Sequence, residues 1–68
     1  MECNFYEGQK VLYRNDEGEL ILGTVVLVYK IPVPARVKAT FKDEEGEFTI
    51  SFTAEGKIAE NFRLFSID

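Results

Sequence analysis

Short runs of hydrophobic and β-branched residues alternate with turn signals along the whole chain. The turn signals are Glu7-Gly8, Asn15 to Gly18, Ile31 to Pro34, Asp43 to Gly46 and Ala54 to Gly56. The runs between them are rich in Val, Ile, Leu, Phe, Tyr and Thr, which suit a half-buried pleated strand. No window carries the apolar period of about 3.6 residues that marks an amphipathic helix. The pattern therefore predicts an all-β chain of five short strands.

The turn at Asp43 to Gly46 specifies the register of the hairpin around it. Pairing Lys42 with Glu47 makes one face of the hairpin wholly apolar and the other wholly polar. A slip of one residue would mix the two faces, so the register is well determined. The apolar pairs are Phe41 with Phe48, Ala39 with Ile50 and Val37 with Phe52. The polar pairs are Thr40 with Thr49, Lys38 with Ser51 and Arg36 with Thr53.

The first predicted hairpin contains a long second strand. Gln9 to Arg14 runs up, Asn15 to Gly18 turns, and Glu19 to Lys30 runs back. Gly23 interrupts the second strand, and a glycine there commonly marks a bulge or a sharp bend. A long bent strand shared by two halves of a sheet closes a small barrel. Val25 to Tyr29 lacks polar alternation, so either both of its faces are covered or one face is exposed and adhesive.

The remaining segments complete the fold prediction. Pro32 and Pro34 lack backbone donors, so they predict a loop or a strand edge. Lys57 to Glu60 is expected to form one helical turn, and Phe62 to Phe65 the last strand. Five strands are too few for a two-sheet sandwich, which favours a strongly bent antiparallel barrel spanning residues 1–68 as one domain. The predicted core residues are Val11, Val25, Val37, Phe41, Phe48, Ile50, Phe52 and Leu64.

The first half of the chain resembles a known family of small barrels. Phe5 to Tyr13 contains the pattern F-x-x-G-x-x-V, and Leu22 to Val25 contains G-x-V. These two stretches resemble the opening of SH3-like barrels of the KOW and Tudor type. The resemblance implies a five-stranded, strongly bent barrel. It implies no particular function, because this barrel serves many unrelated roles.

The second half, Phe48 to Phe65, resembles small uncharacterised phage and bacterial proteins. Their shared pattern is a strand ending in Y/F-T-x-D/E-G-K/R, followed by a terminal L-F. Here the pattern is Phe52 to Lys57 followed by Arg63 to Phe65. Phe52 stands where Tyr is commoner, and Glu55 where Asp is commoner. The resemblance implies a small phage-type protein with a structural or host-modulating role.

Composition excludes several kinds of chemistry. Cys3 is the one cysteine among 68 residues and there is no histidine, so the chain predicts no internal disulfide, no structural metal site and no cofactor. A single thiol also favours the cytoplasm. Without histidine a general base would have to be a carboxylate, Lys or Tyr, and most carboxylates lie in solvated turns, so we expect no enzyme activity. The longest apolar run, Val25 to Tyr29, is too short to span a membrane.

Two groups of side chains are candidate binding residues. Arg36, Lys38 and Lys42 form a basic stripe on the third strand, suited to a phosphate backbone. The opposing interpretation is a solvated face with edge-protecting lysines. Tyr13 and Tyr29, together with Tyr6, would suit an aromatic pocket for methylated cations, or would simply cap the barrel ends with their hydroxyls in water.

The sequence favours a non-enzymatic interaction module. We expect it to bind a protein partner, or a second copy, through a sheet edge or an apolar strand face. A nucleic-acid-binding barrel that uses the basic third strand is the alternative, and a phage-type host-modulating or structural protein is another. The net charge of −4 disfavours nucleic acid, for which we expect no appreciable affinity at physiological salt.

Overall fold

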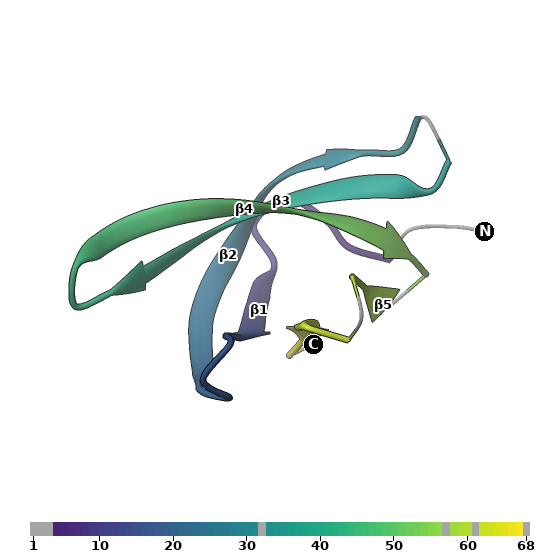
Figure 1. Cartoon of the computed structure of the whole chain (residues 1–68). Helices are drawn as coiled ribbons and strands as arrows, with labels where there is room; N and C mark the ends of the chain where they lie inside the picture. Colours follow the sequence, from purple (N-terminus) through teal and green to yellow (C-terminus); the bar gives the residue numbers. More distant parts are fainter. Residues whose placement is uncertain (1–3, 32, 57, 61, 68) are drawn as a thin grey trace.

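The computed structural model describes residues 4–31, 33–56, 58–60 and 62–67, and this part of the chain contains strands and no helix. Its six strands are β1 (Lys10–Arg14), β2 (Leu20–Tyr29), β3 (Ala35–Asp43), β4 (Gly46–Glu55), β5 (Ile58–Ala59) and β6 (Leu64–Ser66). Figure 1 shows β2, β3 and β4 as long curved ribbons, with the short strands on one side of them. The all-β prediction is confirmed.

Every strand pairs antiparallel with the next one along the chain, and β6 returns to pair with β1. The pairing is very unequal in extent. The β3–β4 ladder runs without interruption from the Ala35–Ala54 pair to the Asp43–Gly46 pair. The return path through β5 is thin, with two paired positions to β4 and one to β6. The order of strands therefore closes, but one side of the sheet is held by only a few residues.

The predicted register of the β3–β4 hairpin is confirmed at every position. Phe41 pairs with Phe48 and Lys42 with Glu47, and all the other predicted cross-strand pairs are present. The Asp43 carboxylate accepts hydrogen bonds from the backbone N–H groups of Glu45 (2.8 Å) and Gly46 (3.1 Å), which fixes the turn. The separation into an apolar and a polar face is thus sufficient to specify this hairpin.

Three local predictions need correction or fall outside the described residues. The expected helical turn at 57–60 is wrong, because Ile58–Ala59 forms β5, while Lys57 lies outside the described residues. The irregularity in β2 lies between Val25 and Leu27, with Val26 as the extra residue, and not at Gly23, which pairs regularly with Val11 and Phe41. Pro34 lies in the bend before β3, whereas Cys3 and Pro32 are not described.

The core lies inside the curved sheet and contains most of the predicted residues. The fully buried ones are Val11, Val25, Val37, Phe41, Phe52 and Leu64. Phe5 and three alanines complete the cluster, and Ala35 is buried outside it. Among the described residues, the buried polar one is Gln9: its Nε2 donates to Ser66 Oγ (2.6 Å) and its Oε1 accepts from the backbone N–H of Tyr6 (3.2 Å). These bonds satisfy an amide that would otherwise be costly to bury.

Phe48 and Ile50 depart from the core prediction, because both are only half-buried. Their side chains point to the inner face and pack against the core, with the rings of Phe48 and Phe41 5.6 Å apart. They remain partly exposed because no described strand covers β4 on its other side at this level. The partial exposure of these two side chains thus follows from the short length of β5.

Candidate functional site

The long strand β4 has an unpaired edge. Only Ala54 and Glu55 pair with β5, while the whole strand pairs with β3 on its other side. Over residues 46–53, no strand of the described chain lies along the second side of β4. An edge of this kind presents backbone donors and acceptors that a further strand can use.

One hydrogen bond at the end of this segment shows which backbone N–H and C=O groups of β4 point away from β3. The backbone N–H of Glu60 donates to the carbonyl of Thr53 (2.8 Å), so Thr53 turns its backbone groups away from β3. In an antiparallel pair, adjacent residues turn their N–H and C=O groups to opposite sides. Glu47, Thr49 and Ser51 therefore also turn their backbone groups outward, and these groups form the free edge of β4.

The free edge carries little of the usual protection against pairing apart from the charge of Glu47. Natural edge strands are commonly blunted by lysine, proline, a bulge or shortness. β4 has ten residues of sequence GEFTISFTAE, with no lysine or proline, and its ladder with β3 has no register shift. Behind this edge lie the half-buried rings and methyl groups of Phe48 and Ile50. The edge thus combines backbone hydrogen-bonding groups with adjacent apolar surface.

Charge is distributed unevenly along the β3–β4 hairpin. Arg36 and Lys38 lie on its outer face in the half away from the turn, opposite Thr53 and Ser51. The turn itself carries Asp43, Glu44 and Glu45, and Glu47 follows two residues after Glu45. Lys42 and Glu47 are Cα partners, but among the described residues the ion pair within 4.0 Å is that of Arg63 with Asp16. The cross-strand pair of Lys42 and Glu47 is therefore not a close ion pair.

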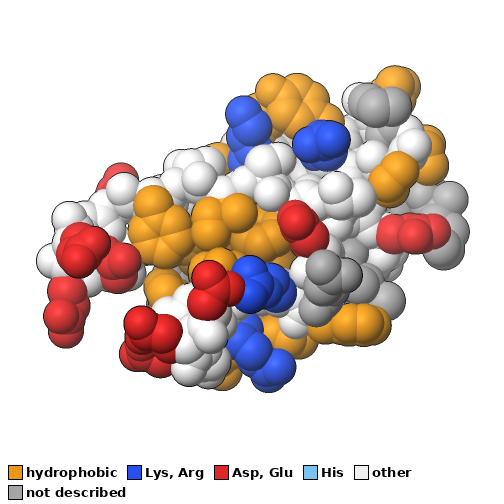
Figure 2. Space-filling model, in the orientation of Figure 1, with side chains coloured by type: hydrophobic (Ala, Val, Ile, Leu, Met, Phe, Trp, Pro, Cys, Tyr) orange, Lys and Arg blue, Asp and Glu red, His pale blue; other side chains and the backbone are white. Residues whose placement is uncertain are grey.

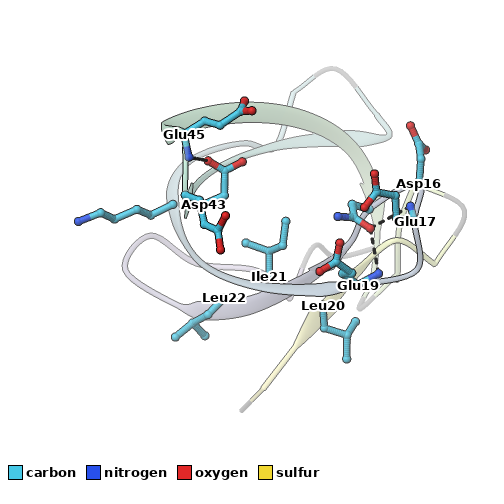
Figure 3. Close-up of a pocket in the computed structure, with 11 residues that line it drawn as sticks. Asp16, Glu17, Glu19, Leu20, Ile21, Leu22, Asp43 and Glu45 are labelled. Atoms are coloured by element: carbon cyan, nitrogen blue, oxygen red, sulfur yellow. Dashed lines mark hydrogen bonds between the residues drawn. The ribbon is translucent and has the colours of Figure 1, made fainter.

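A second feature is an open groove between the tips of the β1–β2 and β3–β4 hairpins (Figure 3). Asp16, Glu17 and Glu19 line one side, and Asp43 to Glu45 the other. Ile21 points into the space between them, whereas Leu20 and Leu22 point away from it. Figure 2 shows acidic side chains gathered over this side of the molecule, with hydrophobic side chains between them. The groove favours cations electrostatically.

The carboxylates crowded at the tip of the β1–β2 hairpin change the pKa of Glu17. The pKa of Glu17 is raised because its carboxyl hydrogen-bonds to that of Glu19 and because the charges of Glu19 and Asp16 repel it. At the same tip Arg63 pairs with Asp16, which raises the pKa of the guanidinium further. The tip is thus tied to the connection between β5 and β6.

We predict that Glu19→Gln lowers the pKa of Glu17 toward its ordinary value. A carboxyl whose pKa is raised in the folded state destabilises the folded protein at pH values above that pKa. This destabilisation disappears as the pH falls below the pKa of the same group in the unfolded chain. The variant should therefore be slightly more stable than the wild type at pH 7 and lose that advantage in acid. Carboxyl-carbon NMR titration of Glu17 measures the shift directly. An unchanged Glu17 titration would show that Glu19 is not its cause.

The outer face of β2 is the apolar strand face anticipated from the sequence. Leu20 (55% exposed), Leu22 (57%) and Val26 (48%) lie outward along it. Leu12 of β1 is the Cα partner of both Leu22 and Phe65, which extends the apolar surface across three strands. For Val25 to Tyr29 the sequence left open whether both faces are covered or one is exposed; Val26 is exposed there, while Val25 is fully buried.

The candidate tyrosines do not form a single pocket. Tyr13 packs inside the sheet against Phe41 and Phe52, with ring centroids 5.2 and 5.7 Å away. Tyr29 lies at the far end of β2, exposed and opposite Arg36. Tyr13 pairs with Ile21 near the start of the same strand, so the two tyrosines lie at different levels of the sheet. Tyr6 is half exposed.

The basic candidates lie on one strand, and at one end of it Arg36 has the aromatic Tyr29 as its cross-strand partner. Arg36 and Lys42 are exposed, Lys38 is half-buried, and Thr40 between them shares a hydrogen bond with Thr49 (3.0 Å). Tyr29 beside Arg36 is the aromatic neighbour that the sequence did not reveal. The stripe thus offers charge along β3 and one ring at its end.

Other kinds of site find little support in the described part of the chain. No group of three or more His, Cys, Asp or Glu side chains among its residues is arranged to hold a metal ion. No helix there is long and apolar enough to cross a membrane.

The free edge of β4 was not identified from the sequence, although a signal for it exists. The fourth predicted strand is much longer than the final one at Phe62 to Phe65, so a short strand cannot cover its whole length.

Comparison with known proteins leaves the KOW, Tudor and phage resemblances unsupported. No family model matches the chain, and no curated protein and no solved structure matches it.

Proposed function

We propose that this protein is a non-enzymatic interaction module that binds an extended protein segment along the free edge of β4. The observation that carries the proposal is the length of that edge, residues 46–53, without a neighbouring strand among the described residues. Addition of a strand to such an edge is a recurring mode of peptide recognition, in which backbone hydrogen bonds supply affinity. Side chains of the added strand supply specificity.

The apolar surface beside the edge supports the same function. A bound segment would cover Phe48 and Ile50, which are half-buried in the isolated chain. Burial of apolar surface contributes about 25 cal/mol per Å², so covering two large side chains adds to the backbone hydrogen bonds. The module needs no cofactor for this role.

The fold we propose is an SH3-like barrel of the KOW and Tudor type. The order of strands, with β6 returning to β1, supports this assignment. The single cysteine favours the cytoplasm as its location. A phage-type host-modulating or structural role is compatible with it, since such a protein would also act by binding.

Nucleic acid is the second candidate partner, favoured by Arg36, Lys38 and Lys42 on one strand. Tyr29 beside Arg36 offers one stacking surface, but the rest of the stripe offers none. Base stacking contributes roughly 1–3 kcal/mol per base, so its absence along most of the stripe weakens binding. The net charge of −4 opposes it as well. Weak binding that appears only in low salt remains our prediction.

Panning a displayed library of random peptides on the immobilised protein tests the proposed function. We expect the selected peptides to bind Ser51→Pro at least about tenfold more weakly than the wild type, a change of about 1.4 kcal/mol. Proline removes the outward N–H of Ser51 from the free edge without removing a donor from the β3–β4 ladder. Fluorescence polarisation with each selected peptide measures the change.

Ser51→Ala is the matched control, because it removes the same side chain and keeps the N–H. It should bind the peptides as the wild type does. A circular-dichroism melt checks that both variants are folded. If Leu22→Asp abolishes binding while Ser51→Pro leaves it unchanged, the outer face of β2 is the binding surface and the proposal for the β4 edge is wrong.

A further inference from the structure

The free edge of β4 is complementary to itself. We propose that its occupant is a second copy of this chain, paired antiparallel to the first with Thr49 facing Thr49 at the two-fold axis. This inference rests on the proposed function, since it uses the same edge. Thr49 is one of the residues whose backbone groups turn outward, as the hydrogen bond to the Thr53 carbonyl establishes.

Charge favours this register over those centred on Glu47 and on Ser51. With Thr49 at the centre, Glu47 of one copy lies opposite Ser51 of the other, and no like charges face each other within this stretch. A pairing centred on Glu47 would place the two Glu47 carboxylates together. One centred on Ser51 would set Glu47 against Glu55, whose outer side already pairs with β5. Like charges directly opposite each other are destabilising in a sheet.

The apolar surface fits the same register. Phe48 of each copy lies opposite Ile50 of the other on the inner face, so the same apolar pair occurs on both sides of the two-fold axis. Both side chains are half-buried in the single chain because β4 has no neighbour there. Pairing covers all four of them. A small domain with a thin core commonly gains stability from this kind of association.

The uneven charge along the β3–β4 hairpin is also complementary between the two copies. Antiparallel pairing brings Glu47 of one copy opposite Ser51 of the other, and Lys38 is the β3 partner of Ser51. Neighbouring strands lie about 4.8 Å apart, so long side chains two strands away can reach each other. The acidic end of each hairpin thus meets the basic half of its partner, which offsets part of the repulsion between two chains of net charge −4.

Sedimentation equilibrium over a range of protein concentrations tests the partner. We expect a reversible dimer whose dissociation constant rises at least about tenfold in Ser51→Pro and is nearly unchanged in Ser51→Ala. A wild type that stays monomeric at every concentration overturns the second copy as occupant. If library peptides still require the Ser51 N–H, the proposed function survives that result, and if they do not, both fail. A dimer that persists in Ser51→Pro uses another surface and also overturns the inference.

Disulfide formation tests the register, in a chain whose native cysteine is removed by Cys3→Ser. Residues at the two-fold axis lie about 5.5 Å apart between Cα atoms, within the range that a disulfide spans. Thr49→Cys should therefore form a covalent dimer on mild oxidation. Thr53→Cys should not, because the two copies of that residue would lie roughly 26 Å apart at about 3.3 Å per residue. Faster cross-linking of Thr53→Cys than of Thr49→Cys would overturn the register.

Discussion

Phe52→Ala is expected to lose about 3–5 kcal/mol of unfolding free energy, the usual cost of truncating a buried phenylalanine to alanine. Phe52 is 2% exposed and packs edge-on to Phe41, with the ring of Tyr13 5.7 Å away. The single core of a chain of 68 residues rarely supplies more than about 3–5 kcal/mol in total. The variant should therefore be largely unfolded at room temperature.

Phe62→Ala is the matched control for this prediction. Phe62 is 63% exposed, so the same truncation there should change the unfolding free energy by about 0.5 kcal/mol or less. Urea titration followed by circular dichroism measures both variants. A cooperative Phe52→Ala transition at the wild-type midpoint would mean that Phe52 does not fill the core as described.

The sequence was sufficient for the parts of this fold that depend on local alternation. In the β3–β4 hairpin every second residue is apolar on both strands, so one register alone separates Phe41 and Phe48 from Lys42 and Glu47. Most of the core followed from the same faces. These features need information from only two adjacent strands and the turn between them.

Features that depend on distant strands were not predicted. The bulge at Val26 lies in an apolar run. Because polar and apolar residues do not alternate in this run, the sequence does not show where an extra residue is inserted. The half-burial of Phe48 and Ile50 depends on how little of β4 is covered by β5, a strand of two residues. The free edge, and with it the candidate site, therefore became apparent only once all the ladders were known.

Gly23 illustrates the same limit and carries the second large prediction. Its position in β2 suggested a bend, but it pairs regularly and its lack of a side chain makes room for the ring of Phe41 on the neighbouring strand. An added Cβ would lie 2.2 Å from Phe41 Cδ1, 2.5 Å from Cε1 and 2.8 Å from the carbonyl oxygen of Thr40. Phe41 cannot easily retreat, because it is fully buried among the rings of Tyr13, Phe48 and Phe52.

Gly23→Ala should therefore destabilise the protein by about 3 kcal/mol, the upper part of the usual range for overpacking a core. This outweighs the roughly 0.5–1 kcal/mol that alanine normally gains over glycine within a strand. Phe41→Leu removes the clashing ring, so Gly23→Ala should cost less in that background, although the Thr40 carbonyl remains close. Urea unfolding of the two single variants and the double variant measures the difference, which we expect to be at least about 1 kcal/mol. Strictly additive losses would show that contact with the Phe41 ring is not what excludes a side chain at position 23.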